Sequence, residues 1–223
     1  MNGENGINRD MISYYRDRAR EYDERAYGVE GRPELQKTIQ AATRILQETL
    51  ANKTVLEIAA GTGYWTEKIA QTARSIEATD VNASVLDIAR GRQYPGRNAH
   101  FRIADLYALG NVPPVEALFG GFIFSHILRK DYGTFLDTIQ RYVVTGGTIV
   151  LMDNNRKDSP QYLDRTDEQG NNYRLRTLAD GTKHEIVKNY PSQTELTGLL
   201  GRRVTNVDFR DLDYYWMLVY KTA

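Results

Sequence analysis

The residues with the clearest chemical potential lie in and around a glycine-rich segment, Val55-Leu-Glu-Ile-Ala-Ala-Gly-Thr-Gly-Tyr-Trp65. Here a short apolar strand is expected to run into a turn that opens a helix. Small residues in such a turn let the backbone approach a ligand closely, and the helix N-terminus presents free amides. Asp80 and Asp105 end the next two predicted strands. Because ligands of open parallel sheets bind outside the carboxyl ends of the strands, these residues predict one adenosine-sized site, in which Asp80 accepts hydrogen bonds from ribose hydroxyls.

The same parts occur in nicotinamide dinucleotide sites, so the two kinds of site must be distinguished. A dinucleotide turn has the pattern G-x-G-x-x-G, which admits a pyrophosphate. This chain has Gly61-Thr-Gly63-Tyr-Trp-Thr66, with Thr66 at the third glycine position and two bulky aromatic residues before it. Glu57 adds a negative charge that repels a pyrophosphate and favours a cationic ligand, such as a sulfonium or an α-amino group. A nicotinamide-dependent reductase is retained as an alternative.

The elements that position these residues alternate between strand and helix. Strands are predicted at 54–58, 75–79, 99–103, 121–125 and 148–152, with helices at 65–72, 83–92 and 131–144. This rhythm indicates a parallel sheet covered on both faces. Two helices precede it, at 8–27 and 33–51. A hairpin at 173–178 and 182–187, a helix opened by the capping box of Ser192 and Glu195, and strands at 204–210 and 214–220 follow it.

In this arrangement the chain resembles the class I S-adenosylmethionine-dependent methyltransferases. Their first motif is an acidic residue followed by x-G-x-G-x-G, and here it reads Glu57-Ile-Ala59-Ala-Gly61-Thr-Gly63, with Ala59 in place of the first glycine. Alanine permits the close approach of a ligand unless its position requires a positive φ. The resemblance implies an α/β fold with a doubly wound, Rossmann-like, seven-stranded sheet. That sheet would be mostly parallel, with an antiparallel C-terminal strand.

The resemblance also implies how the site holds its cofactor, S-adenosylmethionine (SAM). Glu57 and the glycine turn would hold the methionyl part, Asp80 the ribose, and Asp105 with Leu106 the adenine. Further cofactor contacts are expected at Tyr15, Tyr22, Ala59, Gly61, Gly63, Trp65, Asn82 and Ser125. Tyr15 and Tyr22 share one face of the first helix, where they could line the cofactor or the acceptor beneath a helical lid.

Four segments, at 13–23, 57–66, 124–128 and 174–181, further resemble small-molecule methyltransferases of natural-product pathways, in particular the phosphonate-type O-methyltransferases. This narrower resemblance suggests methyl transfer to an oxygen of a small molecule with an acidic or hydroxyl acceptor group. A small-molecule N- or C-methyltransferase is an alternative, and so is a non-catalytic cofactor-binding module.

Methyl transfer from a sulfonium is a direct displacement, in which the enzyme aligns nucleophile, methyl group and sulfur. An ionised acid needs no base, only cationic groups that position it, whereas a hydroxyl acceptor needs a base within hydrogen-bond reach. His126, just after the fourth predicted strand, is placed for either role. Arginine forks suit phosphonate or carboxylate oxygens. The cationic candidates for the acceptor are Arg129, Arg156, Arg174, Arg176 and Lys188.

The end of the fifth predicted strand carries two residues that could contribute to a metal site. Asp153 and Asn154 are of the residue types that bind magnesium in catechol-type methyltransferases. Such a site also needs an acidic residue after the fourth strand, where this chain has Ser125 and His126. The histidines of the chain show no metal-ligand spacing. We therefore predict that no metal takes part.

The composition limits the remaining classes of function. Lys plus Arg number 29, as do Asp plus Glu, and no segment is strongly polarised, which argues against a nucleic-acid partner. A run of about 18 apolar residues is missing, and so is the apolar stretch of a signal peptide. The chain contains no cysteine, which excludes thiolate chemistry. We expect a cytoplasmic protein with a small-molecule partner and no membrane partner, and leave its oligomeric state open.

The chain is expected to form one domain over residues 1–223, since its length allows one substantial core. Residues 1–51 would form a helical lid and residues 52–152 the cofactor-binding core. Residues 153–190 would be an insertion over the active site, followed by a C-terminal helix and strand pair at 191–223.

Overall fold

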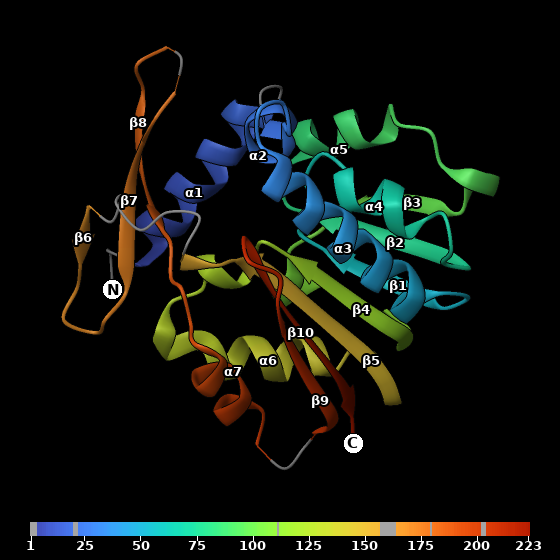
Figure 1. The fold of residues 1–223 in the computed structure, drawn as a ribbon. Coiled ribbons are helices and arrows are strands. Elements are labelled where there is room, and N and C mark those ends of the chain that lie inside the picture. Colours follow the sequence, from blue (N-terminus) through green and yellow to red (C-terminus); the bar gives the residue numbers. More distant parts are fainter. Residues whose placement is uncertain (1–3, 20–21, 111, 157–163, 179, 202–203) are drawn as a thin grey trace.

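A computed structural model describes residues 4–19, 22–110, 112–156, 164–178, 180–201 and 204–223 (Figure 1). The helices are α1 (Glu4–Arg18), α2 (Tyr22–Tyr27), α3 (Pro33–Leu50), α4 (Tyr64–Ile69), α5 (Ala83–Arg90), α6 (Tyr132–Gln140) and α7 (Gln193–Leu200). The strands are β1 (Thr54–Ile58), β2 (Ser75–Asp80), β3 (Ala99–Ile103), β4 (Val115–Gly121), β5 (Val143–Asn154), β6 (Arg165–Thr166), β7 (Asn172–Thr177), β8 (Lys183–Val187), β9 (Val204–Asp211) and β10 (Tyr215–Thr222).

Seven of these strands form one sheet, in the order β3-β2-β1-β4-β5-β10-β9. The neighbours from β3 to β5 are parallel, whereas β10 pairs antiparallel with both β5 and β9. Helices cover both faces of the sheet (Figure 1). The structure therefore confirms the predicted fold, a mostly parallel seven-stranded sheet with an antiparallel C-terminal strand.

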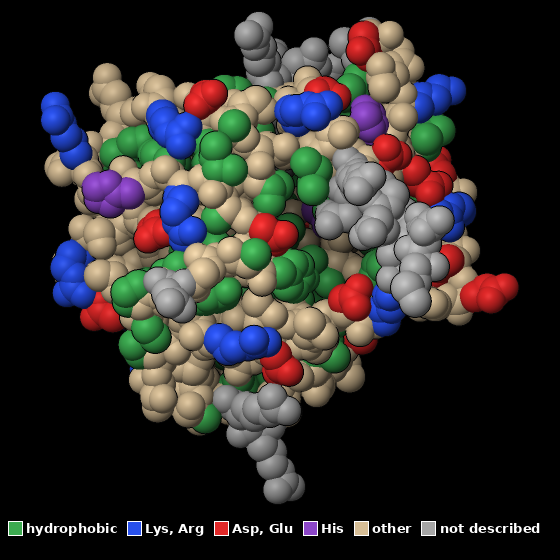
Figure 2. Space-filling view, turned by 180° about the vertical axis from the view of Figure 1, so that it is seen from behind, with side chains coloured by type: hydrophobic (Ala, Val, Ile, Leu, Met, Phe, Trp, Pro, Cys, Tyr) green, Lys and Arg blue, Asp and Glu red, His purple; other side chains and the backbone are tan. Residues whose placement is uncertain are grey.

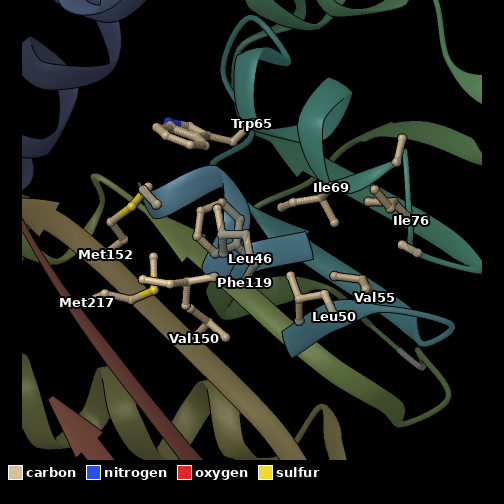
Figure 3. Close-up of a cluster of buried hydrophobic side chains, with 14 of the residues drawn as sticks. Leu46, Leu50, Val55, Trp65, Ile69, Ile76, Phe119, Val150, Met152 and Met217 are labelled. Carbon is tan, nitrogen blue, oxygen red and sulfur yellow. The ribbon is translucent and has the colours of Figure 1, made fainter. Parts of the chain in front are cut away.

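The sheet is buried because alternate residues of its strands face two separate apolar layers. On β1, Val55 packs with α3 and α4, whereas Ile58 packs with α6 and α7. Helix α3 presents a stripe of buried residues that includes Leu46 and Leu50. Figure 3 shows these leucines beside Phe119 of β4 in the first layer. The strands are thus held rigidly from both sides, which fixes the positions of their carboxyl ends.

A second sheet is antiparallel and has the order β6-β7-β8. Strands β7 and β8 form the predicted hairpin around Gly181, whose φ of 86° is left-handed. Helix α1 packs against β8, and both elements lie beyond the end of the large sheet where the parallel strands finish (Figure 1). This placement brings the N-terminal helix and the hairpin over the end of the sheet where the predicted site lies.

The fourth strand differs most from the sequence-based expectation. It was predicted over 121–125, but it spans Val115–Gly121. The prediction followed the apolar residues 122–124. In the structure the chain leaves the sheet at Phe122, whose φ of 58° is left-handed, and forms a short 3-10 helix at Phe124–His126. The prediction was therefore wrong in its bounds, and His126 lies in a turn beyond β4.

Helix α6 and strand β5 also have other bounds than predicted. Helix α6 ends at Gln140, and β5 begins at Val143, so Gly146 and Gly147 lie inside a strand rather than at the end of a helix. A Cβ on Gly147 would lie 2.9 Å from the carbonyl oxygen of Glu116, so only glycine fits this irregular pairing of β4 with β5. In addition, the helix predicted over 8–27 is described as α1 and α2, and β6 was not predicted.

The surface carries charges of both signs. Figure 2 shows one face of the molecule, on which basic and acidic side chains are interspersed, in keeping with the formal net charge of zero. Among the described residues, no helix combines the length and the apolar character needed to cross a membrane.

Candidate functional site

A crevice opens between the glycine turn and α1, at the carboxyl ends of the parallel strands. Its inner part encloses about 850 Å³, counting space open to solvent, and its outer part about 1390 Å³ on the same measure. Asp80 and His126 line both parts, so the two parts are neighbours. The predicted cofactor residues that line it are Tyr15, Glu57, Ala59, Gly61, Trp65, Asp80, Asn82, Asp105 and Leu106.

The turn after β1 owes its shape to three left-handed residues. Ala59, Gly61 and Gly63 have φ angles of 52°, 55° and 77°. The first two line the crevice, but Gly63 lies against α5. A Cβ on Gly63 would meet the Ala89 Cβ at 2.8 Å and the Tyr94 hydroxyl at 2.7 Å. Gly63 therefore allows the start of α4 to pack closely on α5, and its part in ligand binding stays a prediction.

Ala59 has a positive φ, a conformation in which alanine is less stable than glycine. The left-handed conformation strains an alanine by about 1–2 kcal/mol, and glycine would remove this strain. Glycine also makes the unfolded chain more flexible, which cancels roughly 0.4–1 kcal/mol of the gain in stability. We therefore expect Ala59→Gly to raise the free energy of unfolding by about 1 kcal/mol, and Tm by about 2–4 °C. Thermal and urea denaturation measure both quantities.

The neighbouring Ala60 supplies the control for this prediction. Ala60 lines the same turn but lies outside the left-handed region, so Ala60→Gly should destabilise the protein by about 0.5–1 kcal/mol. If the two variants changed stability in the same direction, backbone strain at Ala59 would not be the cause.

Glu57 is a buried carboxylate that lines the inner crevice. Its residue is 2% exposed, and its Oε2 atom forms no hydrogen bond within the described part of the chain. Burial raises the pKa of the carboxyl to about 8, and the nearby charge of Asp80 adds to this rise. A cation placed beside such a carboxylate stabilises its ionised form. The inner crevice is thus suited to a ligand with a positive charge.

Asp80 ends β2 with both carboxylate oxygens bonded to backbone amides. Oδ2 accepts from the Gly61 amide at 3.0 Å, and Oδ1 accepts from the Asn82 amide at 2.9 Å. These bonds hold the carboxylate against the glycine turn, and each oxygen keeps a second lone pair for a ligand. Asn82 also donates from Nδ2 to the Ile12 carbonyl at 3.2 Å. This side of the crevice is therefore tied to helix α1.

His126 uses both nitrogens of its ring. Nδ1 lies 2.6 Å from the Val187 carbonyl, which can only accept, so the proton is on Nδ1. Nε2 then accepts a hydrogen bond from the Tyr15 hydroxyl at 2.6 Å. Burial, together with the charge of Lys188, lowers the pKa of His126 to about 3. At neutral pH the imidazole is therefore uncharged, and it orients Tyr15 at the crevice wall.

The predicted cationic residues have different surroundings. Arg129 forms an ion pair with Glu195, and the Lys188 ammonium donates to three side-chain oxygens. Arg156 is exposed, and Arg174 is buried. Arg176 is half-buried, and its Nε forms no hydrogen bond within the described residues. The charge of Arg176 contributes to the low pKa of His126, so the two side chains are near one another.

Aromatic side chains that the sequence did not predict form a wall of the inner crevice. Tyr27 of α2 stacks on Tyr64 with ring centroids 3.7 Å apart, and Phe122 contacts the same Tyr27 ring at 6.1 Å. Tyr64 directly follows the last glycine of the turn, a position that could have identified it. Two further residues were predicted to contact the cofactor. Ser125 is fully buried and does not line the crevice. The side chain of Tyr22 lies outside the described residues.

Comparison with known proteins shows what the chain is similar to. Residues 55–147, which contain the glycine turn, match the model of a methyltransferase domain. The chain is thus similar to SAM-dependent methyltransferases, in agreement with the sequence resemblance. Two solved structures similar to it over nearly their whole length are a DhpI–SAH complex and a DhpI–SAM–HEP complex. The first is 27% identical to this chain and the match covers 98% of it. The second is 25% identical and the match covers 97% of it. Each match covers 98% of the solved chain and has a TM-score of 0.79.

Other relatives are similar over less of the chain or in fold alone. Demethylmenaquinone methyltransferase of Tropheryma whipplei (strain Twist) is 29% identical over 114 residues. This match spans 50% of the chain and 46% of the relative, so it covers about half the length of such curated proteins. A 1,6-didemethyltoxoflavin-N1-methyltransferase of Burkholderia thailandensis is 16% identical, with a TM-score of 0.62 and coverage of 96% and 88%, and supports the fold only.

Proposed function

We propose that the protein transfers the methyl group of SAM to an oxygen of a small, ionised acid. The observation that carries this proposal is that the charge of Arg176 lies near His126. His126 is a neutral imidazole with both nitrogens hydrogen-bonded, and it lies near an arginine whose buried Nε lacks a partner among the described residues. The His126 imidazole therefore has no free nitrogen to act as a base, whereas Arg176 offers a cationic group, which suits an acceptor that arrives as an anion.

The donor half of the crevice fits SAM. The buried Glu57 carboxylate, whose Oε2 has no partner among the described residues, would match the positive charge of the methionyl part. Asp80 retains lone pairs for the ribose hydroxyls. Asp105 and Leu106 line the outer crevice, where they would contact the adenine. When bound, SAM supplies a methyl group on a cationic sulfur, which an acceptor oxygen can displace directly.

Next to the crevice, the β7–β8 hairpin carries donors that lack acceptors among the described residues. Arg176 of β7 is paired directly with His184 of β8, so both side chains leave the same face of the hairpin. Both ring nitrogens of His184 are buried without a partner among the described residues, and its ring lies 5.8 Å from that of Tyr14. Buried donors of this kind gain most from anionic oxygens. We therefore assign acceptor binding to this face.

The surrounding segments would complete the site. Tyr15, oriented by His126, would position the acceptor, and the stacked rings of Tyr27 and Tyr64 would exclude water from the methyl group. In this proposal the described parts of residues 1–51 act as a lid over the donor side of the site. The described parts of residues 153–190 cover the acceptor side, and both belong to one domain with the core at 52–152. Residues 1–3, 20–21, 157–163 and 179 lie outside the described residues.

The proposal predicts that an acid is the preferred acceptor. We would compare a carboxylic acid, an alcohol and an amine with one carbon skeleton at saturating SAM, and identify the methylated products by mass spectrometry. We expect a methyl ester as the main product. We also expect kcat to change less than about two-fold between roughly pH 6 and 8, because a base with a pKa in that range is not required.

Two outcomes would contradict the proposal. Faster turnover of the amine would favour N-methylation. A kcat that rises about tenfold per pH unit would show that a base removes a proton from the acceptor. Binding of NAD without binding of SAM would instead support the reductase alternative.

A further inference from the structure

A buried ammonium group stands at the end of β5, beyond the crevice wall. Lys188 Nζ donates to Ser125 Oγ and to Asn154 Oδ1, each at 2.8 Å, and to Asp153 Oδ1 at 3.2 Å. The Lys188 side chain is 7% exposed and that of Asp153 0%. An ammonium has three hydrogens, so these bonds use all of them. Lys188, which was predicted to bind the acceptor, therefore has no donor left for it in this arrangement.

The oxygens around Lys188 are of the types that divalent cations bind. A carboxylate, an amide carbonyl and a hydroxyl are hard oxygen ligands, as preferred by Mg²⁺ and Mn²⁺. They converge from the turn after β4 and from the end of β5. The lysine satisfies the same oxygens with a single positive charge. It also neutralises Asp153, which would otherwise be an unpaired buried charge.

The residues on either side of Lys188 hold the same turn. The Val187 carbonyl accepts the Nδ1 hydrogen of His126, and the Asn189 amide donates to the Ser125 carbonyl at 2.7 Å. Three consecutive residues, from the last residue of β8 to Asn189, are thus bonded to the turn that carries His126. The orientation of the imidazole consequently depends on how firmly Lys188 binds the end of β5.

We propose that the Lys188 ammonium is a built-in cation that takes the place of a divalent metal ion, and that it positions His126 from outside the crevice. The cation that binds the oxygens of Ser125, Asp153 and Asn154 is then a side chain of the protein itself, so these oxygens need no metal ion. Lys188 is a positioning residue, because it acts on the site through His126. Removing its side chain should convert the three oxygens into a site for a divalent cation.

Metal binding by a variant tests the first part of the proposal. Lys188→Ala is titrated with Mn²⁺ up to about 1 mM, and the free ion is followed by electron paramagnetic resonance. We expect the variant to bind one ion and the wild-type protein none. The double variant Lys188→Ala/Asp153→Asn should lose the ion, which would locate it. Lys183→Ala, which changes an exposed lysine of β8, is the matched control and should behave as wild type.

The orientation of His126 tests the second part of the proposal. It should change in a Lys188 variant only if Lys188 positions the imidazole, and not if Lys188 merely stabilises the fold. In the wild-type protein, the Nδ1 hydrogen bonded to Val187 should give a downfield, slowly exchanging proton signal. We expect Lys188→Ala to lose this signal, and Mg²⁺ to restore it and to raise Tm, while Mg²⁺ leaves the wild type unchanged. If Lys188→Ala does not fold alone, folding on addition of Mg²⁺ is the equivalent result.

The outcomes that overturn the proposal are equally direct. They are equal Mn²⁺ binding by wild type and Lys188→Ala, no binding by the variant, an unchanged His126 signal in Lys188→Ala, or no effect of Mg²⁺ on that signal and on Tm. Neither measurement uses an acceptor or SAM. Failure here is therefore distinguishable from failure of the proposed methyl-transfer function.

Discussion

Glu57→Gln is expected to weaken SAM binding by about 30- to 1000-fold while it stabilises the cofactor-free protein. The loss of affinity follows because glutamine cannot pair with a buried positive charge, a change that costs about 2–4 kcal/mol. The gain in stability follows because burial raises the pKa of the Glu57 carboxyl from 4.5 to about 8. Opposite signs for the two effects would separate a lost charge contact from general misfolding.

The sign of the stability effect follows from proton linkage. Between the two pKa values the folded protein binds the Glu57 proton and the unfolded chain does not, so stability falls as pH rises from about 4.5 to about 8. Glutamine has no ionised form to bury. We therefore expect Glu57→Gln to raise the free energy of unfolding by about 1–3 kcal/mol at neutral pH. Urea denaturation of both proteins across this pH range measures the difference.

The raised pKa of Glu57 also makes SAM binding pH-dependent. Below about pH 8 the carboxyl is mostly protonated in the free protein, whereas a bound cation favours the ionised form. Binding near pH 7 should therefore release close to one proton, and affinity should rise up to about tenfold per pH unit between roughly pH 6 and 8. Calorimetry in buffers of different ionisation enthalpy counts the protons. Glu67→Gln, at a partly exposed carboxylate of α4, is the control and should leave the release unchanged.

Arg176→Gln is expected to lower kcat/KM for an acid acceptor by about 10- to 100-fold, because a hydrogen bond from a charged donor is worth about 1.5–3 kcal/mol. SAM affinity should change less than about two-fold, since Arg176 lines neither part of the crevice in which the cofactor residues lie. Steady-state kinetics and calorimetry measure the two quantities separately. Arg176→Lys should recover part of the activity, because it keeps the charge but not the planar fork.

The exposed Arg165 supplies a matched control for Arg176. Arg165 lies on β6 and pairs with Glu185, so Arg165→Gln removes one arginine from the same small sheet without touching the proposed acceptor face. We expect its kcat/KM to equal that of the wild type. Equal losses in both variants, or full activity of Arg176→Gln, would remove Arg176 from the acceptor site.

The donor half of the crevice could be predicted because its residues belong to strong local patterns. Glu57 and Gly61 lie where an apolar strand runs into a glycine turn, and Asp80 ends the next strand. In a parallel sheet these positions must meet at one edge. The structure brings all three together. The acidic residue and glycines of one short segment were therefore sufficient to locate the crevice, and the part of each residue in SAM binding stays a prediction.

The surroundings of the hairpin cations could not be predicted in the same way. Arg176 and Lys188 both look like charges of a hairpin in the sequence. In the structure, Arg176 is near His126 and its Nε has no partner among the described residues, whereas Lys188 is enclosed by oxygens of β5 and the β4 turn. Their different surroundings arise from how the hairpin packs on the large sheet. Nothing in the local sequence of the hairpin records that packing.

The error in the fourth strand has a similar cause. Residues 122–124 are apolar and were read as the strand, but Phe122 takes a left-handed conformation while its amide donates to the Met152 carbonyl at 2.7 Å. This bond to a neighbouring strand holds a conformation that a bulky residue seldom adopts alone. A local pattern cannot report a conformation that a distant partner imposes.

Helix α1 reaches both halves of the crevice within one turn. The Ile12 carbonyl accepts from Asn82 beside Asp80, and the Tyr15 hydroxyl donates to His126. Residues three apart lie on one side of a helix, so a helix that moves as one body gives up both contacts together. If helix α1 is part of the proposed lid, the donor and acceptor sites would open together. Release of both products would then depend on one opening event, and slow release of either product would delay the next turnover.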